Sequence, residues 1–287
     1  MKNILSYTTF IFFLVSCSNK YSENDKNTNS EFQKSKEAVL KDTTFGVTSD
    51  MVKIDGGKYV PLYGRDSQLV IVDSFFMDIL PVTNGDFRAF VRQNKRWRKS
   101  KVKKIFADGN YLNSWLNDTT LGAKMNDSSP ITNVSWYAAK AYCECQGKQL
   151  ATVDEWEFVA RANQEFADAR KVKSYNQFIL DWYEKPKTHT EKVGQTDKNY
   201  WGVYDLHGLV WEWTSDFSSI LLTGESRNDI ETDKNLFCGN GSLNATDLMN
   251  YAAFMRYAYR NSLKANYCTK NLGFRCIKYD YNSTLTD

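Results

Sequence analysis

The chain has 287 residues, of which 25% are charged and 42% apolar, and these ordinary proportions exclude disordered and fibrous classes of protein. Aromatic residues make up 15% of the chain, which favours a domain that packs irregular loops around large side chains. The formal net charge of +3 is too close to neutral to indicate nucleic-acid binding, and two histidines are too few for a histidine-rich zinc or iron site.

The first segment has the pattern of a bacterial lipoprotein signal peptide. Lys2 gives a short basic start, an apolar stretch runs over residues 4–15, and the small residue Ser16 precedes Cys17. The apolar stretch is shorter than the roughly 20 residues that a membrane-spanning helix needs. We therefore predict a signal peptide over residues 1–17 with Cys17 lipidated, and the alternatives are a plain secretory signal or a membrane anchor.

Residues 18–50 are dominated by Asn, Lys, Ser, Glu and Asp. Such a composition buries too little apolar surface to offset the entropy lost on ordering. We predict a polar tether that joins a lipid anchor to a folded domain over residues 51–280, with a tail over residues 281–287. This layout places the domain at the cell envelope, held to a membrane by lipid, in a compartment where disulfides form.

The beginning of the folded part carries strand and helix signals. Gly56 and Gly57 predict a turn, and residues 70–76 predict a strand because they are rich in apolar residues. Thr83 is suited to cap a helix, since apolar residues follow it at i, i+3, i+4 spacing. The apolar face of that helix consists of Phe87, Phe90 and Val91.

Two more helices are predicted further along the chain. One begins at Ser135 and is closed by Gly147. The other follows Thr152, which forms a capping box with Glu155. Short strands and long loops are expected elsewhere, so the fold class is a mixed α+β domain of low regularity.

Residues 92–104 hold eight Lys or Arg residues around Trp97. Basic residues with an interleaved aromatic are found in surfaces that bind nucleic acid or anionic lipid. A solvated loop is the more common structure for such a run, and no nucleic-acid partner is predicted.

Three stretches together carry a specific family pattern. The first reads P-I-T-N-V-S-W at 130–136 and is followed by A-Y-C at 141–143 and G-K-Q-L-A-T-V-D-E-W-E at 147–157. The second reads G-V-Y-D-L-H-G-L-V-W-E-W at 202–213. The third reads R-N-S at 260–262, followed by N-L-G-F-R-C at 271–276. From about Met51 to Tyr279 the chain resembles the sulfatase-modifying factor family, whose founding members are the formylglycine-generating enzymes. The resemblance implies a single α+β domain with sparse secondary structure and a C-type-lectin-like core.

The catalytic pattern of that family is incomplete here. Formylglycine-generating enzymes oxidise a peptide cysteine with molecular oxygen and a Cu(I) ion held by two thiolates, ligands that suit this soft ion. The positions that match those two cysteines hold Ala245 and Ala252. The resemblance therefore implies no catalytic residue of this kind and no bound copper. Cys238 and Cys268 flank the missing pair, and they are either substitute ligands, a structural disulfide or buried free thiols.

The resemblance also implies a disulfide between Cys143 and Cys276. It implies a calcium ion, an ion that prefers hard oxygen ligands. The implied ligands are Asp205, the carbonyl groups of Gly208 and Val210, and Glu212. In the alternative, Asp205 caps a turn and Glu212 pairs with an arginine such as Arg275.

Further residues match motifs around the family's peptide groove. The resemblance implies that Trp211, Ser242 and Arg260 line or support this groove, and each is equally suited to a scaffold role. Asn176 is the weak counterpart of a further family calcium ligand.

Three functions follow from these motifs. The first is a lipid-anchored, non-oxidising accessory, maturation or binding factor for an envelope protein or peptide, similar to accessory proteins of nitrite reductases. The second is an oxygen-dependent oxidoreductase that modifies a peptide cysteine with a non-standard metal site. The third is a structural lipoprotein of a gliding or secretion machine. Carbohydrate binding through the lectin-like core rests on fold analogy alone.

Overall fold

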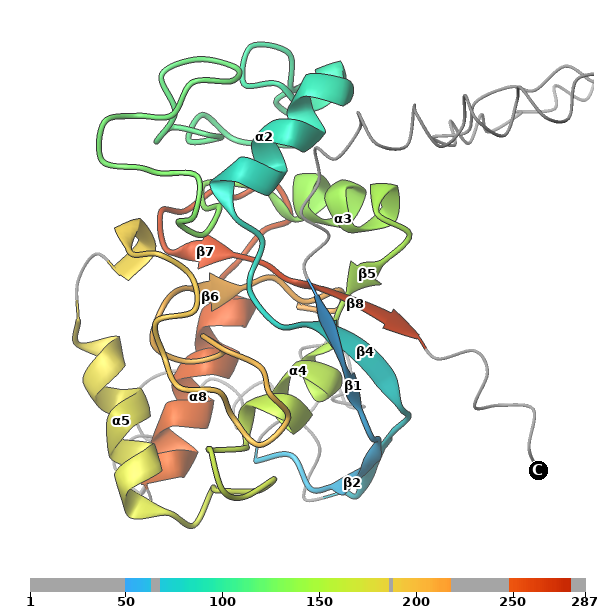
Figure 1. The fold of residues 1–287 in the computed structure, drawn as a ribbon, viewed down its shortest axis with the longest axis vertical. Helices are drawn as coiled ribbons and strands as arrows, with labels where there is room; N and C mark the ends of the chain where they lie inside the picture. Colours follow the sequence, from blue (N-terminus) through green and yellow to red (C-terminus); the bar gives the residue numbers. More distant parts are fainter. Residues whose placement is uncertain (1–49, 63–67, 186–187, 218–247, 280–287) are drawn as a thin grey trace, which may run out of the picture. The chain divides into compact units, whose positions relative to one another are not determined.

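A four-stranded antiparallel sheet forms the centre of the fold in the computed structural model (Figure 1). The structure describes residues 50–62, 68–185, 188–217 and 248–279. In spatial order the strands are β1 (Met51–Ile54), β4 (Phe75–Asp78), β8 (Cys276–Tyr279) and β5 (Gln149–Leu150). The last described strand of the chain thus lies between β4 and β5, inside the sheet.

Two smaller sheets accompany the central one. An antiparallel pair is formed by β2 (Gly57–Tyr59) and β3 (Val70–Val72). A parallel pair is formed by β6 (Trp211–Glu212) and β7 (Leu272–Gly273), which joins two motifs far apart in the sequence.

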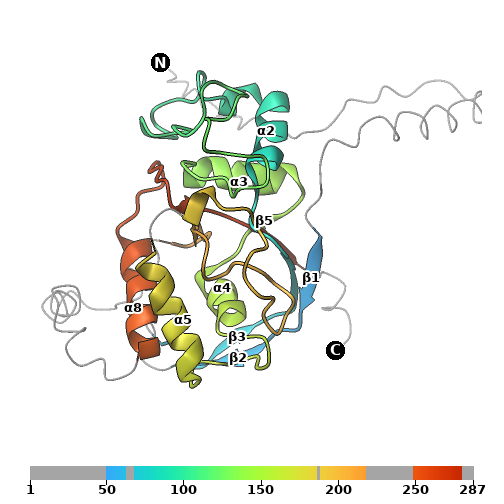
Figure 2. The same cartoon turned by 60° about the vertical axis from the view of Figure 1, so that its left-hand side comes forward.

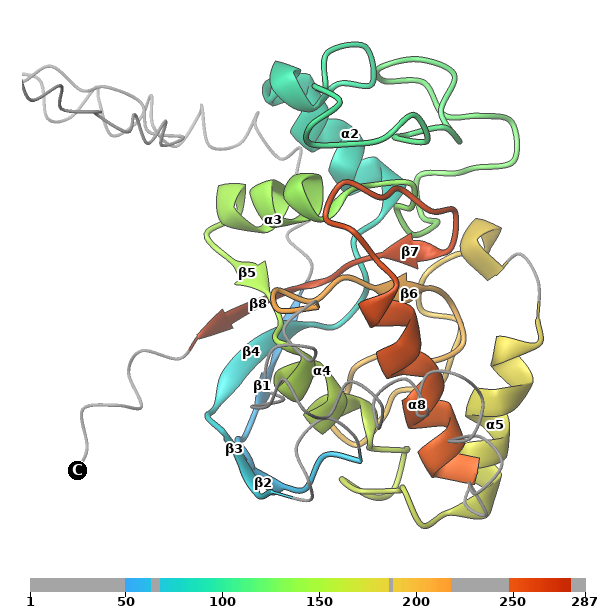
Figure 3. The same cartoon turned by 180° about the vertical axis from the view of Figure 1, so that it is seen from behind.

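The helices lie around these sheets. They are α2 (Asn84–Gln93), α3 (Trp136–Cys145), α4 (Val153–Ala160), α5 (Lys173–Tyr183) and α8 (Leu248–Asn261), with 3-10 turns η1 (Lys95–Trp97) and η2 (Thr188–Thr190). α5 and α8 pack side by side in all three views (Figures 1, 2 and 3). The turns and loops that follow α2 form one end of the described fold, and β2 and β3 lie toward the opposite end.

The predicted helix starts are confirmed. Thr83 and Thr152 each form a capping box, in which the threonine hydroxyl accepts the N3 amide and the N3 carboxylate accepts the amide of the capping residue. Ser135 caps α3 by accepting the amide of Ala138. Gly147 follows the end of α3 with a φ of +65°, a conformation that glycine adopts without steric cost.

The single strand predicted over residues 70–76 is wrong. The chain forms β3 and β4, which belong to different sheets and are separated at Asp73 and Ser74. The opposing strand breaks at the same level, where Gly56 separates β1 from β2. A Cβ atom on Gly56 would lie 2.2 Å from the carbonyl oxygen of Val72, so this bend needs a glycine. The strand prediction missed it because the bend depends on backbone contact across the hairpin.

The central sheet separates two parts of the core, since neighbouring strand residues point to opposite faces. In β8, Cys276 joins one cluster and Ile277 joins the other. The first cluster includes residues of α2 and α3, and the second packs the sheet against α4. The predicted α+β class with short regular elements is confirmed. No helix among the described residues has the length and apolarity that a membrane span requires.

Candidate functional site

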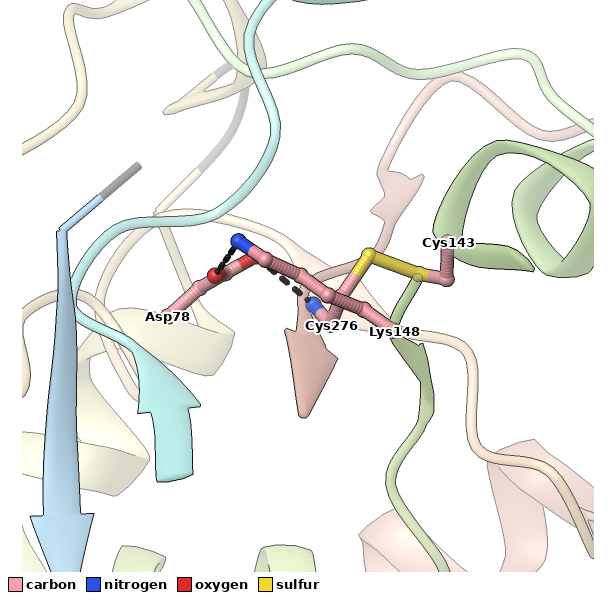
Figure 4. Close-up of a disulfide and its surroundings, with 4 residues drawn as sticks. All are labelled: Asp78, Cys143, Lys148 and Cys276. Atoms are coloured by element: carbon pink, nitrogen blue, oxygen red, sulfur yellow. Dashed lines mark hydrogen bonds and ion pairs between the residues drawn. A yellow bond between two sulfur atoms is a disulfide. The ribbon is translucent and has the colours of Figure 1, made fainter. Parts of the chain in front are cut away.

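The predicted disulfide between Cys143 and Cys276 is present and joins α3 to β8 across 133 residues of sequence (Figure 4). The buried carboxylate of Asp78 lies beside it. One oxygen of Asp78 is 2.6 Å from Nζ of Lys148, and the other accepts the Cys276 amide at 3.1 Å. The disulfide and this ion pair together fix the C-terminal motif to the middle of the sheet.

Glu212 in β6 is paired with Arg275, as in the alternative to calcium binding. The guanidinium donates Nε–H and Nη2–H to the carboxylate at 2.8 to 3.0 Å, and Trp156 Nε1–H donates to it at 2.8 Å. Both partners are buried, with 4% of Glu212 and 1% of Arg275 exposed. A bidentate pair of this kind uses both carboxylate oxygens.

Asp205 caps a turn, which is also the alternative stated above. Its backbone has a left-handed φ of 59°, and its buried carboxylate accepts the amides of Gly194 and Thr196. The hydroxyl of Thr196 donates to the same carboxylate at 3.0 Å. Gly208 follows with a φ of +103°, and Val210 is buried.

The two carboxylates of the predicted calcium site therefore have other partners. A calcium ion at Glu212 would have to displace a buried guanidinium, so Glu212 does not fit a calcium ligand in this arrangement. The described part of the chain holds no group of three or more His, Cys, Asp or Glu side chains suited to a metal. Asn176 is buried and donates to the carbonyl group of Arg170. Calcium binding stays a prediction.

Trp211, a predicted groove residue, lies in a cluster of four aromatic rings. Its ring centroid is 4.7 Å from that of Tyr259, 5.0 Å from Tyr183 and 5.5 Å from Trp182. α5, β6 and α8 each contribute to this aromatic cluster. The four rings pack against one another, and this packing orients the half-buried indole of Trp211.

Arg260, the other described groove residue, is buried, and its guanidinium contacts other buried side chains of the site. It contacts Glu157 at 2.7 Å, and Arg256 contacts the other oxygen of the same carboxylate at 2.8 Å. The guanidinium of Arg260 also lies over the ring of Trp156, 4.8 Å from its centroid. Arg256 donates to the hydroxyl of Tyr183 at 3.3 Å, and this contact joins the Glu–Arg cluster (Glu157, Arg256, Arg260) to the aromatic cluster.

The charges in the Glu–Arg cluster hold Glu157 ionised. Burial alone would raise its pKa, but the positive charges of Arg256 and Arg260 outweigh burial and lower the pKa to about 2. Glu157 lies in the E-W-E part of a family motif, but no role was predicted for it. The available signal was the pair of arginines at i, i+4 near the end of the chain, a spacing that places both on one helix face.

The position predicted to match the second copper-binding cysteine holds an alanine. Ala252 in α8 is fully buried and packs with Ile179 of α5. Cys268 is also buried, and burial followed by the charge of Asp108 raises the pKa of its thiol. Four further predicted residues lie outside the described residues: Cys17, Cys238, Ser242 and Ala245.

Comparison with known proteins agrees with these motifs. Residues 36–279 match the family model of the sulfatase-modifying factor enzyme 1-like domain. The inactive C-alpha-formylglycine-generating enzyme 2 of Bos taurus is 29% identical over 279 residues, with 80% of this chain and 88% of the relative covered. The formylglycine-generating enzyme of Mus musculus is 27% identical, with 81% of this chain and 72% of the relative covered.

PvdO from Pseudomonas aeruginosa has a TM-score of 0.46 and 20% sequence identity, with 80% of this chain and 94% of that chain covered. The family model spans most of the described residues and both motifs that meet at the parallel β6–β7 pair. The chain is therefore a member of the sulfatase-modifying factor enzyme 1-like (formylglycine-generating enzyme) family.

Proposed function

We propose that this chain is a non-oxidising family member that serves as an accessory, maturation or binding factor for a protein or peptide of the cell envelope. The observation that carries the proposal is Ala252. A Cu(I) site of the family kind needs two thiolates, and this position holds a methyl group inside the α5–α8 contact. The sequence places a second alanine, Ala245, at the other ligand position.

A relocated copper site at Cys268 has little support. The thiolate is the form that binds metal, and burial raises the pKa of this thiol. Its Sγ atom also lies 3.5 Å from the carbonyl oxygen of Asn266, to which it donates. An oxidase that used Cys238 and Cys268 would have to ionise a thiol that its surroundings keep protonated.

A binding role is supported by the aromatic cluster. Tryptophan and tyrosine contribute strongly to interfaces because they bury large areas at low entropic cost. Trp211 is the half-buried member of the predicted groove, whereas Arg260 is buried and acts by positioning Trp156 and Glu157. We propose that Trp211 and Tyr259 contact the partner peptide and that the Glu–Arg cluster supports them.

The location is part of the same proposal. Cys17 would carry the lipid, and residues 18–50 would let the domain reach its partner from the membrane surface. Lipid anchoring can be tested by labelling cells with a fatty-acid analogue, since replacement of Cys17 by serine should abolish the label.

The first experiment measures bound metal in the chain from Ser18 onward, which keeps the whole compact unit Phe45–Asp287. We expect no copper or iron after copper loading and no oxygen consumption with a cysteine peptide. Stoichiometric copper that is lost in Cys238→Ala or Cys268→Ala, together with oxygen consumption, would overturn the proposal in favour of an oxidase. Calcium is measured in the same samples.

The second experiment tests the binding face by crosslinking and purification from envelope extracts. Trp211→Ala should lose the partner that the wild-type chain retains. Tyr200→Ala removes an aromatic side chain that is 54% exposed and serves as the matched control. Equal loss of the partner in both variants would contradict the proposed binding face.

A further inference from the structure

The basic run over residues 92–104, which begins in the last turn of α2, forms an exposed cationic surface. Six of its side chains are exposed, and among the described residues none of the six has an acidic partner within ion-pair distance. They are Arg92, Lys95, Arg96, Lys101, Lys103 and Lys104. The acids that contact this segment include Asp118, which accepts two hydrogen bonds from Ser100.

Large apolar side chains stand out beside these cations. Ile105 is 70% exposed and Phe106 is 39% exposed, and they are the two residues after Lys104. Leu116 is 71% exposed and is held near the run because Lys99 donates to the carbonyl group of Trp115. A single exposed apolar residue is ordinary, but three of them around a cationic surface indicate an interaction site.

The surface has a fixed conformation. The guanidinium of Arg98 donates to the carbonyl groups of Val91 and Arg92, and the amide of Val102 bonds to the carbonyl group of Arg98. Trp97 is only 6% exposed and anchors the segment in the core. The cations and apolar tips are therefore presented without the cost of ordering a mobile loop.

We propose that this surface, defined as the six cations with Ile105, Phe106 and Leu116, binds anionic lipid bilayers. Lysine and arginine side chains contact headgroup phosphates, and the apolar tips insert at the boundary of the acyl chains. Nucleic acid fits the surface less well. Of the two aromatic residues that could stack on bases, Trp97 is buried and Phe106 packs against Trp97 and Tyr137. The aliphatic tips make no hydrogen bonds to bases.

The position of the surface in the fold suits this contact. The residues after α2 form one end of the described fold, and α5 and α8 lie in the half away from that end (Figures 1 and 3). A bilayer at this end leaves α5 and α8 facing away from the lipid. The inference does not depend on the lipid anchor, because the domain itself makes the contact.

The test is co-sedimentation with lipid vesicles, using the chain from Ser18 onward, which lacks the predicted lipid anchor at Cys17. We expect binding to phosphatidylcholine vesicles that contain phosphatidylglycerol, none to phosphatidylcholine alone, and weakening at high salt. The triple variant K101E/K103E/K104E should bind at least on the order of 100-fold more weakly, because each basic residue lost at an anionic surface removes about a fivefold effect and each new carboxylate adds repulsion. The control variant K171E/K173E/K185E changes the net charge by the same amount at exposed positions elsewhere. It should bind the vesicles more tightly than K101E/K103E/K104E does.

The apolar tips are tested separately. I105S/L116S should reduce the binding that remains at high salt, whereas L69S/I71S, which alters two other exposed apolar residues, should not. Thermal unfolding of every variant confirms that it is folded. The inference is overturned if anionic vesicles are not bound, if the two charge variants lose binding equally, or if duplex DNA is bound tightly with no effect of I105S/L116S. None of these results tests whether the chain binds copper or a partner peptide, so the inference can fail while the proposed function stands.

Discussion

The carboxylate of Glu157 is the counter-ion of two buried guanidiniums. It lies between Arg256 and Arg260, and all three side chains are buried. Glu157→Gln would leave two guanidiniums without a counter-ion, so we predict a loss of about 3–5 kcal/mol in the free energy of unfolding. Urea denaturation at neutral pH measures it. Glu165→Gln, at an exposed position, is the control and should change little.

The same substitution should change the acid sensitivity of the fold. The folded-state pKa of Glu157 is about 2, below the ordinary value of 4.5, so its stabilisation is complete above pH 4.5 and is lost as the pH falls toward 2. The difference in stability between the wild type and Glu157→Gln should therefore shrink over this range. A constant difference would contradict the ionised state of Glu157.

His207 should affect the pH dependence of stability at higher pH than Glu157 does. Burial first, and the charge of Arg256 second, lower its pKa from 6.5 to about 3, so the folded chain holds the ring neutral. This contribution is complete above pH 6.5 and is lost as the pH falls toward 3. We predict that His207→Gln flattens the pH dependence of stability between pH 6.5 and 4.5. His189→Gln, at a half-buried position, should flatten it less; a larger effect at His189 would refute the assignment.

Single residues of this site were predictable only through the family motifs. Arg260, Glu212 and Glu157 all belong to quoted motifs, but no role was predicted for Glu157 because its partners are 99 and 103 residues away in sequence. Sequence spacing cannot place such distant groups together. The pairing of Glu212 with Arg275 was foreseen as the alternative to calcium, and both readings used the same motif.

At the scale of elements, the helix caps carry measurable stability. Thr152 accepts the amide of Glu155, and Glu155 accepts the amide of Thr152 in return. Thr152→Ala removes the hydroxyl acceptor, and we predict a loss of about 1 kcal/mol in the free energy of unfolding. Thr152→Ser keeps the acceptor and should retain most of the stability. Chemical denaturation compares the two variants, and equal losses would refute the capping contribution.

Elements with local signals were predictable, and elements without them were not. The caps at Thr83, Ser135 and Thr152 are read from a few adjacent residues, and all three were predicted. α5 was missed because it follows Val172, which makes no side-chain capping bond, although Ile179 and Trp182 are on its buried face. The break between β3 and β4 was missed because it arises from backbone contact with another strand.

At the scale of the whole molecule, the Cys143–Cys276 disulfide restricts the unfolded chain. It joins residues 133 apart, and the loop-entropy model gives about 4–5 kcal/mol for a loop of this length. We predict that the double variant Cys143→Ala, Cys276→Ala loses stability of this order and that reducing agent lowers the melting temperature of the wild type alone. Cys145→Ala is the control; a reductant effect that persists in the double variant would contradict the prediction.

The place of β8 in the sheet has a consequence for how the chain matures. β8 pairs with β4 on one side and β5 on the other, yet it is made after both. Until the ribosome has added residues 276–279, β4 and β5 lack their shared neighbour, and their unpaired edges can join other strands. The central sheet can therefore close only after residues 276–279 have been made. In that interval the exposed strand edges are the surfaces on which a chaperone would act.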